Sequence, residues 1–259
     1  IQGISGTVDL IRRRGADAPD FAPMVMADKV AGLHAGSGIT MALLYRERTG
    51  EGQQIEIPMF EAVASFNFVE HLSGAAFEPP LAPPGYSRVL DPNRRPHRTR
   101  DGFMVVLPYN DKQCRGFFDA AGRPDLAKDE RFASANSRSR NVDQFYSLIS
   151  ELMATKTTAE WVPLLKQADV PAIPANTLED VISDEHLQAT GFFTEYDHPT
   201  EGRVRTTGVP LHFARTPGSS TRRPPPRLGE NTRSVLAENG FSAAEINALF
   251  QSGSARQAD

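Results

Sequence analysis

The chain has 259 residues, of which 39% are hydrophobic and 23% charged, and its formal net charge is −4 at pH 7. This composition is typical of a soluble globular protein and excludes a disordered or collagen-like chain. Surfaces that bind nucleic acid are normally basic, so the mild acidity argues against nucleic acid as a partner. The single cysteine, Cys114, cannot close a disulfide within the chain, so we expect a reducing, cytoplasmic location.

The chain opens on Ile1 rather than on a methionine, without the basic and apolar pattern of a signal peptide. Its longest uncharged run, Val30 to Tyr45, is shorter than the roughly 18 to 20 apolar residues that cross a bilayer, so we expect no association with a membrane. Residues 1–75 predict a single strand, whereas a doubly wound domain needs several βαβ units. We therefore expect the chain to be part of a longer protein.

Residues 29–48 have the pattern of a buried helix, with cations in the last turn and Gly50 placed to end it. Alternating side chains over residues 53–57 predict a strand, and a helical pattern resumes over residues 59–72. Helix, strand and helix in succession are typical of an α/β layer.

Six prolines between Glu78 and His97, followed by several arginines, predict an extended linker. Beyond it we expect a strand over residues 103–107, helices over 112–121 and 142–154, and a helix that Thr157 and Glu160 begin as a capping box. Strands over 192–196 and 203–213 follow. Two short helices end the chain, the second opened by another capping box at Ser242 and Glu245.

Asp28 stands where an apolar extended segment meets the first long helix. An N-cap is its simplest role. However, Ala31 occupies the position where a capping box has Glu or Gln, and Lys29 places a cation in the first turn, against the helix dipole. A carboxylate held there by fixed donors is ionised at pH 7 and suited to attack a thioester or anhydride carbonyl. The histidines show no metal-ligand spacing with Cys114, so we predict no metal site.

Three long segments around Asp28 resemble, in order, the family III coenzyme A transferases, namely Ala27–Gly36, Gly38–Gln53 and Ile55–Ala62. This family includes the carnitine and bile-acid enzymes, formyl-CoA transferase and α-methylacyl-CoA racemase. Four shorter matches lie further along the chain, at Asp101–Phe103, Gly122–Leu126, Thr158–Trp161 and Pro225–Thr232. The similarity covers nearly all of residues 1–250.

The resemblance implies an α/β fold class, with an incomplete nucleotide-type large domain and a small α+β domain. Residues 1–77 would belong to the large domain and carry the nucleophile helix, residues 78–100 would form the Pro-rich linker, and residues 101–190 the small domain. Residues 191–259 would supply return strands and C-terminal helices that pack on the large domain. Members of the family are interlocked dimers, so the resemblance also implies a homodimer.

In this family the aspartate that matches Asp28 is the nucleophile. It carries coenzyme A from an acyl-CoA donor to a carboxylic acid acceptor through an aspartyl-CoA thioester. The resemblance therefore implies acyl-CoA and a carboxylate as substrates, with coenzyme A entering as a thioester and no permanently bound cofactor. The residues that bind coenzyme A stay unassigned, because in the family most of them precede the segment that begins this chain.

Two alternatives remain at this point. The racemases of the family exchange a proton by means of a His/Asp pair and a Glu, and Asn110 stands near the matching position of that Glu, close to the substrate. An amide does not exchange a proton at neutral pH, which favours transfer, but a register slip of one residue would place Asp111 there instead. The other alternative is a non-catalytic remnant that dimerises or binds without holding coenzyme A.

Overall fold

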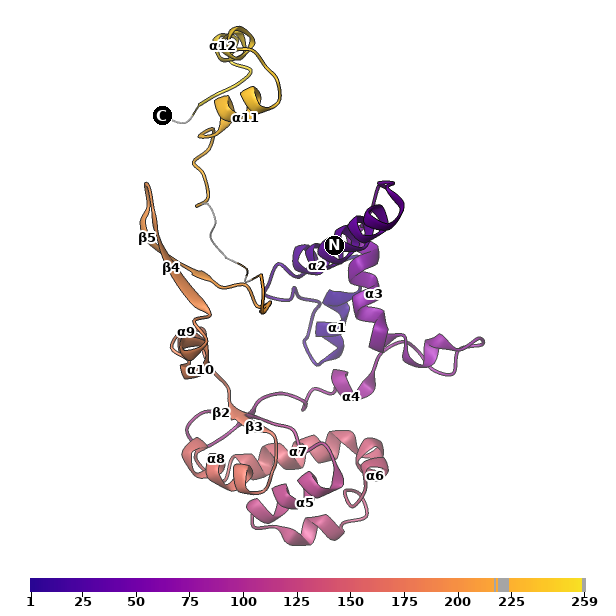
Figure 1. Ribbon diagram of the computed structural model, residues 1–259. Helices are drawn as coiled ribbons and strands as arrows, with labels where there is room; N and C mark the ends of the chain where they lie inside the picture. Colours follow the sequence, from indigo (N-terminus) through magenta and orange to yellow (C-terminus); the bar gives the residue numbers. More distant parts are fainter. Residues whose placement is uncertain (217, 219–223, 258–259) are drawn as a thin grey trace. The chain divides into compact units, whose positions relative to one another are not determined.

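The structure is a computed structural model that describes residues 1–216, 218 and 224–257 (Figure 1). The chain divides into two compact units, Ile1–Ala175 and Asn176–Asp259. Both units combine helices with short strands, which confirms the expected α/β fold class. The expected domain boundaries at residues 77, 100 and 190 stay predictions.

The first unit is mainly helical. Its α-helices are α1 (Thr7–Arg13), α2 (Met26–Thr49), α3 (Met59–His71), α4 (Ser87–Leu90), α5 (Asp111–Ala120), α6 (Ala135–Arg140), α7 (Val142–Met153) and α8 (Thr158–Gln167). Two short 3₁₀ helices, η1 (Ser73–Ala76) and η2 (Pro124–Lys128), lie between them. The capping box predicted for α8 is confirmed, because Thr157 Oγ1 accepts from the Glu160 backbone N–H and the Glu160 carboxylate accepts from the Thr157 N–H.

A small antiparallel sheet completes the first unit, with β1 (His97–Arg98), β2 (Phe103–Val106) and β3 (Ala172–Pro174) in the order β1-β2-β3. Met104 at the start of β2 pairs with His97 on one side and with Pro174 on the other. Alternate residues of a strand face opposite sides, and Met104 and Val106 accordingly enter the core while Phe103 is exposed. The sheet takes its first strand from the end of the Pro-rich segment.

The main core lies between this sheet and helices α5, α7 and α8. Trp161 at its centre is fully buried, stacks on Phe117 with 6.1 Å between ring centroids, and donates from Nε1 to the Met153 carbonyl at 2.9 Å. Cys114 is buried in α5. Most of the large apolar side chains between residues 104 and 170 are thus used for packing in one continuous core.

A second, smaller core joins α2 to α3 through Ala27, Val30, Ala62 and Val63. The helix expected over residues 29–48 exists, but it begins at Met26, and the prediction that it is buried is wrong for most of its length. Its apolar side chains are spread around the helix rather than gathered on one stripe, and only Ala27 and Val30 of this helix are fully buried.

The strand predicted over residues 53–57 is also wrong. The segment is extended, but it has no partner strand among the described residues, and a strand needs a neighbour for its backbone hydrogen bonds. Its alternation has a different origin: Ile55 and Ile57 both lie against Gly38 of α2, where an added Cβ would stand 3.7 Å from Ile55 Cγ2.

The second unit contains a hairpin and short helices. Its elements are α9 (Leu178–Ile182), α10 (Glu185–Ala189), β4 (Phe193–His198), β5 (Gly202–Thr207), α11 (Thr232–Glu238) and α12 (Ala243–Gln251). Phe193 pairs with Thr207, so β5 ends there and not at residue 213 as predicted, because β4 offers no partner beyond Phe193. The capping box of α12, formed by Ser242 and Glu245, is confirmed.

Candidate functional site

Asp28 lies in the first turn of α2. The expectation that it caps the helix is wrong: Val25 occupies the N-cap position, and no side chain caps this end of the helix. The Asp28 side chain is exposed, and within the described residues its carboxylate has no hydrogen-bond or ion-pair partner. The fixed donors expected around this carboxylate are therefore absent from the described part of the chain.

The backbone around Asp28 is held from two sides. Before the helix, the Gln2 carboxamide accepts from the Ala22 N–H at 2.9 Å and donates to the Met24 carbonyl at 3.2 Å. Within the helix, Ala27 and Val30 are buried against α3. Side chains one turn apart share a helix face, so these contacts fix the first turn and leave Asp28 on the open side.

This geometry suits a carboxylate that must react. The carboxylate stands on the first turn of α2, beside backbone N–H groups that have no partner within the helix. Its two oxygens are unengaged in the described part of the chain and stand in solvent, where an electrophile has access to them.

Asn110, expected near the substrate, is the N-cap of α5. Its Oδ1 accepts from the Gln113 N–H at 2.9 Å, and Gln113 Oε1 accepts from the backbone N–H of Tyr109 at 2.9 Å and of Asn110 at 3.3 Å. Asn and Gln three residues apart form a capping box, which the sequence itself signals. Its proximity to a substrate stays a prediction, and among the described residues no contact joins Asn110 to Asp28.

Asp111, the neighbour that a register slip would select, is engaged in an ion pair. Arg138 of α6 donates from Nη2 to Asp111 Oδ1 at 2.6 Å, and this hydrogen bond holds the pKa of Asp111 below its usual range. A carboxylate that is held ionised in this way is a poor partner for proton exchange at neutral pH. Sequence reasoning did not find Arg138, because it lies 27 positions further along the chain.

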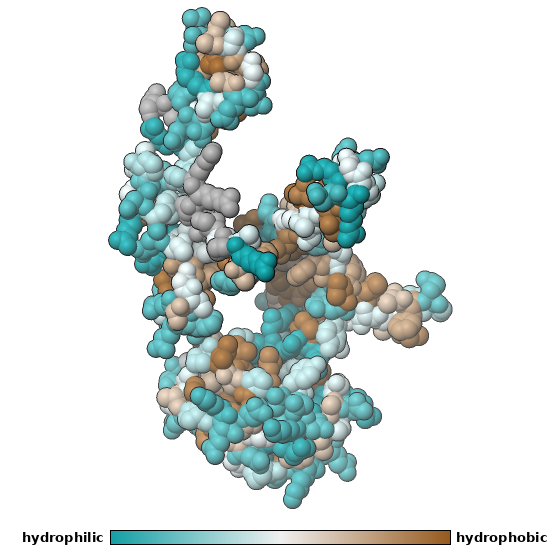
Figure 2. All heavy atoms as spheres, in the orientation of Figure 1, coloured by the Kyte–Doolittle hydropathy of each residue, from teal (hydrophilic) through white to brown (hydrophobic). Residues whose placement is uncertain are grey.

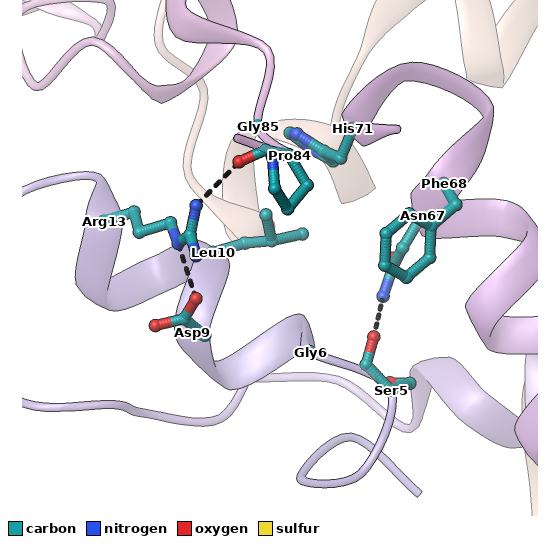
Figure 3. A pocket seen from close by; sticks show the side chains of 10 residues that line it. All are labelled: Ser5, Gly6, Asp9, Leu10, Arg13, Asn67, Phe68, His71, Pro84 and Gly85. Carbon is teal, nitrogen blue, oxygen red and sulfur yellow. Dashed lines mark hydrogen bonds and ion pairs between the residues drawn. The ribbon is translucent and has the colours of Figure 1, made fainter. Parts of the chain in front are cut away.

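A cavity of about 80 Å³ lies in the first unit between α1, the end of α3 and residues 84–85 (Figure 3). Its polar groups bind one another: Asn67 donates to the Ser5 carbonyl at 3.0 Å, and Arg13 bonds both Asp9 at 2.5 Å and the Pro84 carbonyl at 2.8 Å. Asp28 is not among the residues that line it. This cavity therefore adds no group to the candidate site at Asp28.

Among the residues that the structure describes, no group of three or more His, Cys, Asp or Glu side chains is arranged to hold a metal ion. In the same described part of the chain, no helix is long and apolar enough to span a membrane.

Comparison with known proteins shows the family of this chain. The family model described as CoA-transferase family III matches residues 1–232. The chain belongs to this family. The match includes Asp28, Asn110 and both cores, and it confirms the family expected from the sequence.

Relatives within the family include a cinnamoyl-CoA:phenyllactate CoA-transferase of Clostridium sporogenes, 27% identical over 95% of this chain and 60% of the relative. A probable fatty acyl-CoA transferase of Mycobacterium tuberculosis is 30% identical over 85% of this chain and 58% of the relative. The crystal structure of a CaiB/BaiF family protein from Brucella suis matches with a TM-score of 0.69 and 27% identity, over 92% of this chain and 61% of that one. The chain thus spans about 60% of the length of these relatives.

Proposed function

We propose that this chain is the nucleophile-bearing part of a family III CoA-transferase and that Asp28 carries first the acyl group and then coenzyme A. The observation that carries the proposal is the combination of family membership over residues 1–232 with an exposed, unpartnered carboxylate on the fixed first turn of α2. The Clostridium sporogenes relative is named as a CoA-transferase and the Mycobacterium tuberculosis relative as a probable one, which favours the same class of reaction here.

The proposed reaction has four balanced steps. An Asp28 oxygen attacks the thioester carbonyl of the donor and releases the coenzyme A thiolate, leaving a mixed anhydride. The thiolate attacks the aspartyl carbonyl of this anhydride, which releases the donor acid and leaves an aspartyl-CoA thioester. The acceptor carboxylate attacks that thioester and again releases the thiolate. The thiolate finally attacks the acceptor carbonyl, forming the new acyl-CoA and restoring Asp28.

The racemase alternative is not favoured. Asn110 carries an amide, which is neither an acid nor a base at neutral pH, and caps α5, while Asp111 is paired with Arg138. Neither residue therefore offers a free acid or base in place of the glutamate that a racemase needs.

We further propose that the protein acts as a cytoplasmic homodimer in which a second copy covers α2 and α3. Both helices carry exposed apolar side chains, including Leu33 at 75%, Met41 at 70% and Val69 at 87% exposure, and Figure 2 shows apolar surface in this part of the first unit. Large apolar side chains exposed on two adjoining helices are typical of an interaction site. Sedimentation velocity of the full-length protein tests this: a monomer at micromolar concentration contradicts it.

The experiment for Asp28 is chemical trapping. The full-length protein is mixed with hydroxylamine and with cinnamoyl-CoA, the acyl-CoA in the name of the Clostridium sporogenes relative, and its peptides are analysed by mass spectrometry. We expect a hydroxamate on Asp28, because hydroxylamine captures anhydrides and thioesters. We also expect Asp28→Asn to lower transferase activity on the order of 10⁴-fold or more, as loss of a covalent nucleophile does.

Asp143→Asn is the matched control. Asp143 also lies exposed in the first turn of a helix that no side chain caps, but it belongs to α7. The Asp143→Asn protein is expected to keep its activity and still to form the hydroxamate on Asp28. Transfer that continues while Asp28 stays unmodified would refute the mechanism.

Calorimetry of coenzyme A with the 259-residue chain tests the remnant alternative. Binding with micromolar affinity would contradict that alternative.

A further inference from the structure

A second cavity in the first unit, of about 50 Å³, lies between α4, the turn after β2, α6 and α7. A cavity needs roughly 10–15 Å³ to hold one water molecule. This cavity therefore has room for a few heavy atoms, about the size of an acetate ion. Two arginines and two tyrosines line it together with proline, valine and phenylalanine side chains. Its lining residues differ from those of the cavity beside α1, and Asp28 is not among them.

The first arginine, Arg138, is part of the wall. Its side chain is only 6% exposed, and it donates from Nη1 to the Phe132 carbonyl at 2.8 Å and from Nη2 to Asp111 at 2.6 Å. Its positive charge is therefore compensated by the carboxylate of Asp111, and its orientation is fixed.

The second arginine, Arg88 of α4, has no such compensation. Its guanidinium carbon lies 5.0 Å from the centroid of the Tyr109 ring, and its hydrogen bond to the buried Tyr146 side chain raises its pKa. The side chain is half-buried, and no carboxylate pairs with it in the described part of the chain. One positive charge thus faces a cavity lined by both polar and apolar side chains, with no counter-ion in the described part of the chain.

A partly buried charge without a counter-ion costs free energy, and a bound anion lowers that cost. A carboxylate matches the planar fork of a guanidinium with two parallel hydrogen bonds, and its alkyl end suits apolar walls. We propose that this cavity is a binding site for a small carboxylate of acetate size, with Arg88 as its charged partner. The site does not depend on the chemistry proposed for Asp28, and its occupancy is measurable without turnover.

The test titrates sodium acetate into the full chain, labelled with ¹⁵N-arginine, at constant ionic strength. The reporter is the Nε–Hε signal of Arg138, which stays present when Arg88 is changed. We expect a saturable shift with acetate and none with acetamide, the neutral molecule of the same shape. We also expect Arg88→Gln to weaken acetate binding roughly tenfold or more, as loss of a charged hydrogen bond does, and Arg88→Lys to give an intermediate affinity.

Arg131→Gln is the matched control, because Arg131 also lies over an aromatic ring, 4.8 Å from the Phe132 centroid, but already pairs with Asp129 at 2.7 Å. It is expected to bind acetate with unchanged affinity. Four results would each overturn the site: no saturable shift with acetate, an equal shift with acetamide, undiminished binding in a folded Arg88→Gln protein, or inorganic phosphate binding more tightly than acetate. The selectivity between acetate and acetamide uses the unchanged chain, so it decides the question even if the Arg88 variants fail to fold.

Discussion

Replacing Arg138 by methionine is expected to destabilise the main core by about 3 kcal/mol, because the arginine bonds two groups that lie far apart in the sequence. It is buried and donates to the Phe132 carbonyl and to the Asp111 carboxylate. Methionine keeps most of the apolar stem and its packing, so the substitution removes mainly the two polar contacts.

The magnitude follows from the two contacts taken separately. A hydrogen bond from a charged donor to a buried carbonyl is worth about 1.5–3 kcal/mol, and its loss leaves that carbonyl unsatisfied. The Asp111 side chain is 44% exposed, so solvent reduces the ion pair to about 1 kcal/mol. Asp111→Asn, which removes only the pair, is expected to cost about 1 kcal/mol, and the double variant about 3 kcal/mol, which gives a coupling energy of about 1 kcal/mol.

Urea unfolding followed by tryptophan fluorescence measures these differences, because the chain has one tryptophan and Trp161 lies in the core that Arg138 supports. The pKa of Asp111 is lowered by Arg138, so the pair stabilises the fold above the unfolded-state pKa of about 3.9 and is lost as the pH falls through the lower folded-state pKa. The difference between the wild type and Asp111→Asn should therefore vanish in acid. A cost of Arg138→Met below about 1 kcal/mol, or one equal to that of Asp111→Asn, would refute the reasoning.

Three further predictions concern two glycines, Cys114 and His97. Gly116→Ala should destabilise by roughly 1–3 kcal/mol, since its Cβ would stand 2.9 Å from the Ala168 carbonyl oxygen, whereas Gly32→Ala in α2 meets nothing within 4 Å. The Gly32 variant should therefore stabilise by roughly 0.5–1 kcal/mol in thermal melts, and a loss of stability there would contradict the argument. Burial raises the pKa of Cys114 to about 11, so a chromogenic disulfide reagent at pH 8 should react with it only after denaturation; rapid reaction of the folded chain would contradict this. Burial lowers the pKa of His97 to about 4, so its ring should remain neutral by NMR at pH 5.5, and its contribution to stability should fall as the pH drops from about 6.5 towards 4; titration near pH 6.5 would contradict this.

Features governed by neighbouring residues were predictable from the sequence. The capping box of α8 depends only on Thr157 and Glu160, three positions apart, and the box of α12 depends on Ser242 and Glu245 in the same way. The helix α7 was predictable because its buried side chains recur with helical spacing, as Phe145, Ile149 and Leu152 do.

Features that need a distant partner were not predictable in this way. The alternation over residues 53–57 looked like a strand, yet it reflects contacts of Ile55 and Ile57 with Gly38 of α2. Asp28 lies in the first turn and not at the cap, because the helix begins at Met26 without any side-chain signal. The pairing of Asp111 with Arg138 depends on α5 and α6 lying together, which no local pattern encodes.

The Gln2 side chain holds the backbone that leads into α2. Its carboxamide accepts from the N–H of residue 22 and donates to the carbonyl of residue 24, as the edge of a neighbouring strand would do. One side chain thus makes the two hydrogen bonds that a neighbouring strand would make, so few other residues should be tolerated at position 2. Glutamate has no donor for the carbonyl, and asparagine is one methylene too short to reach both groups from the same backbone position. A substitution at residue 2, which is remote from Asp28 in the sequence, should therefore shift the backbone of residues 22–24 and with it the turn that carries Asp28.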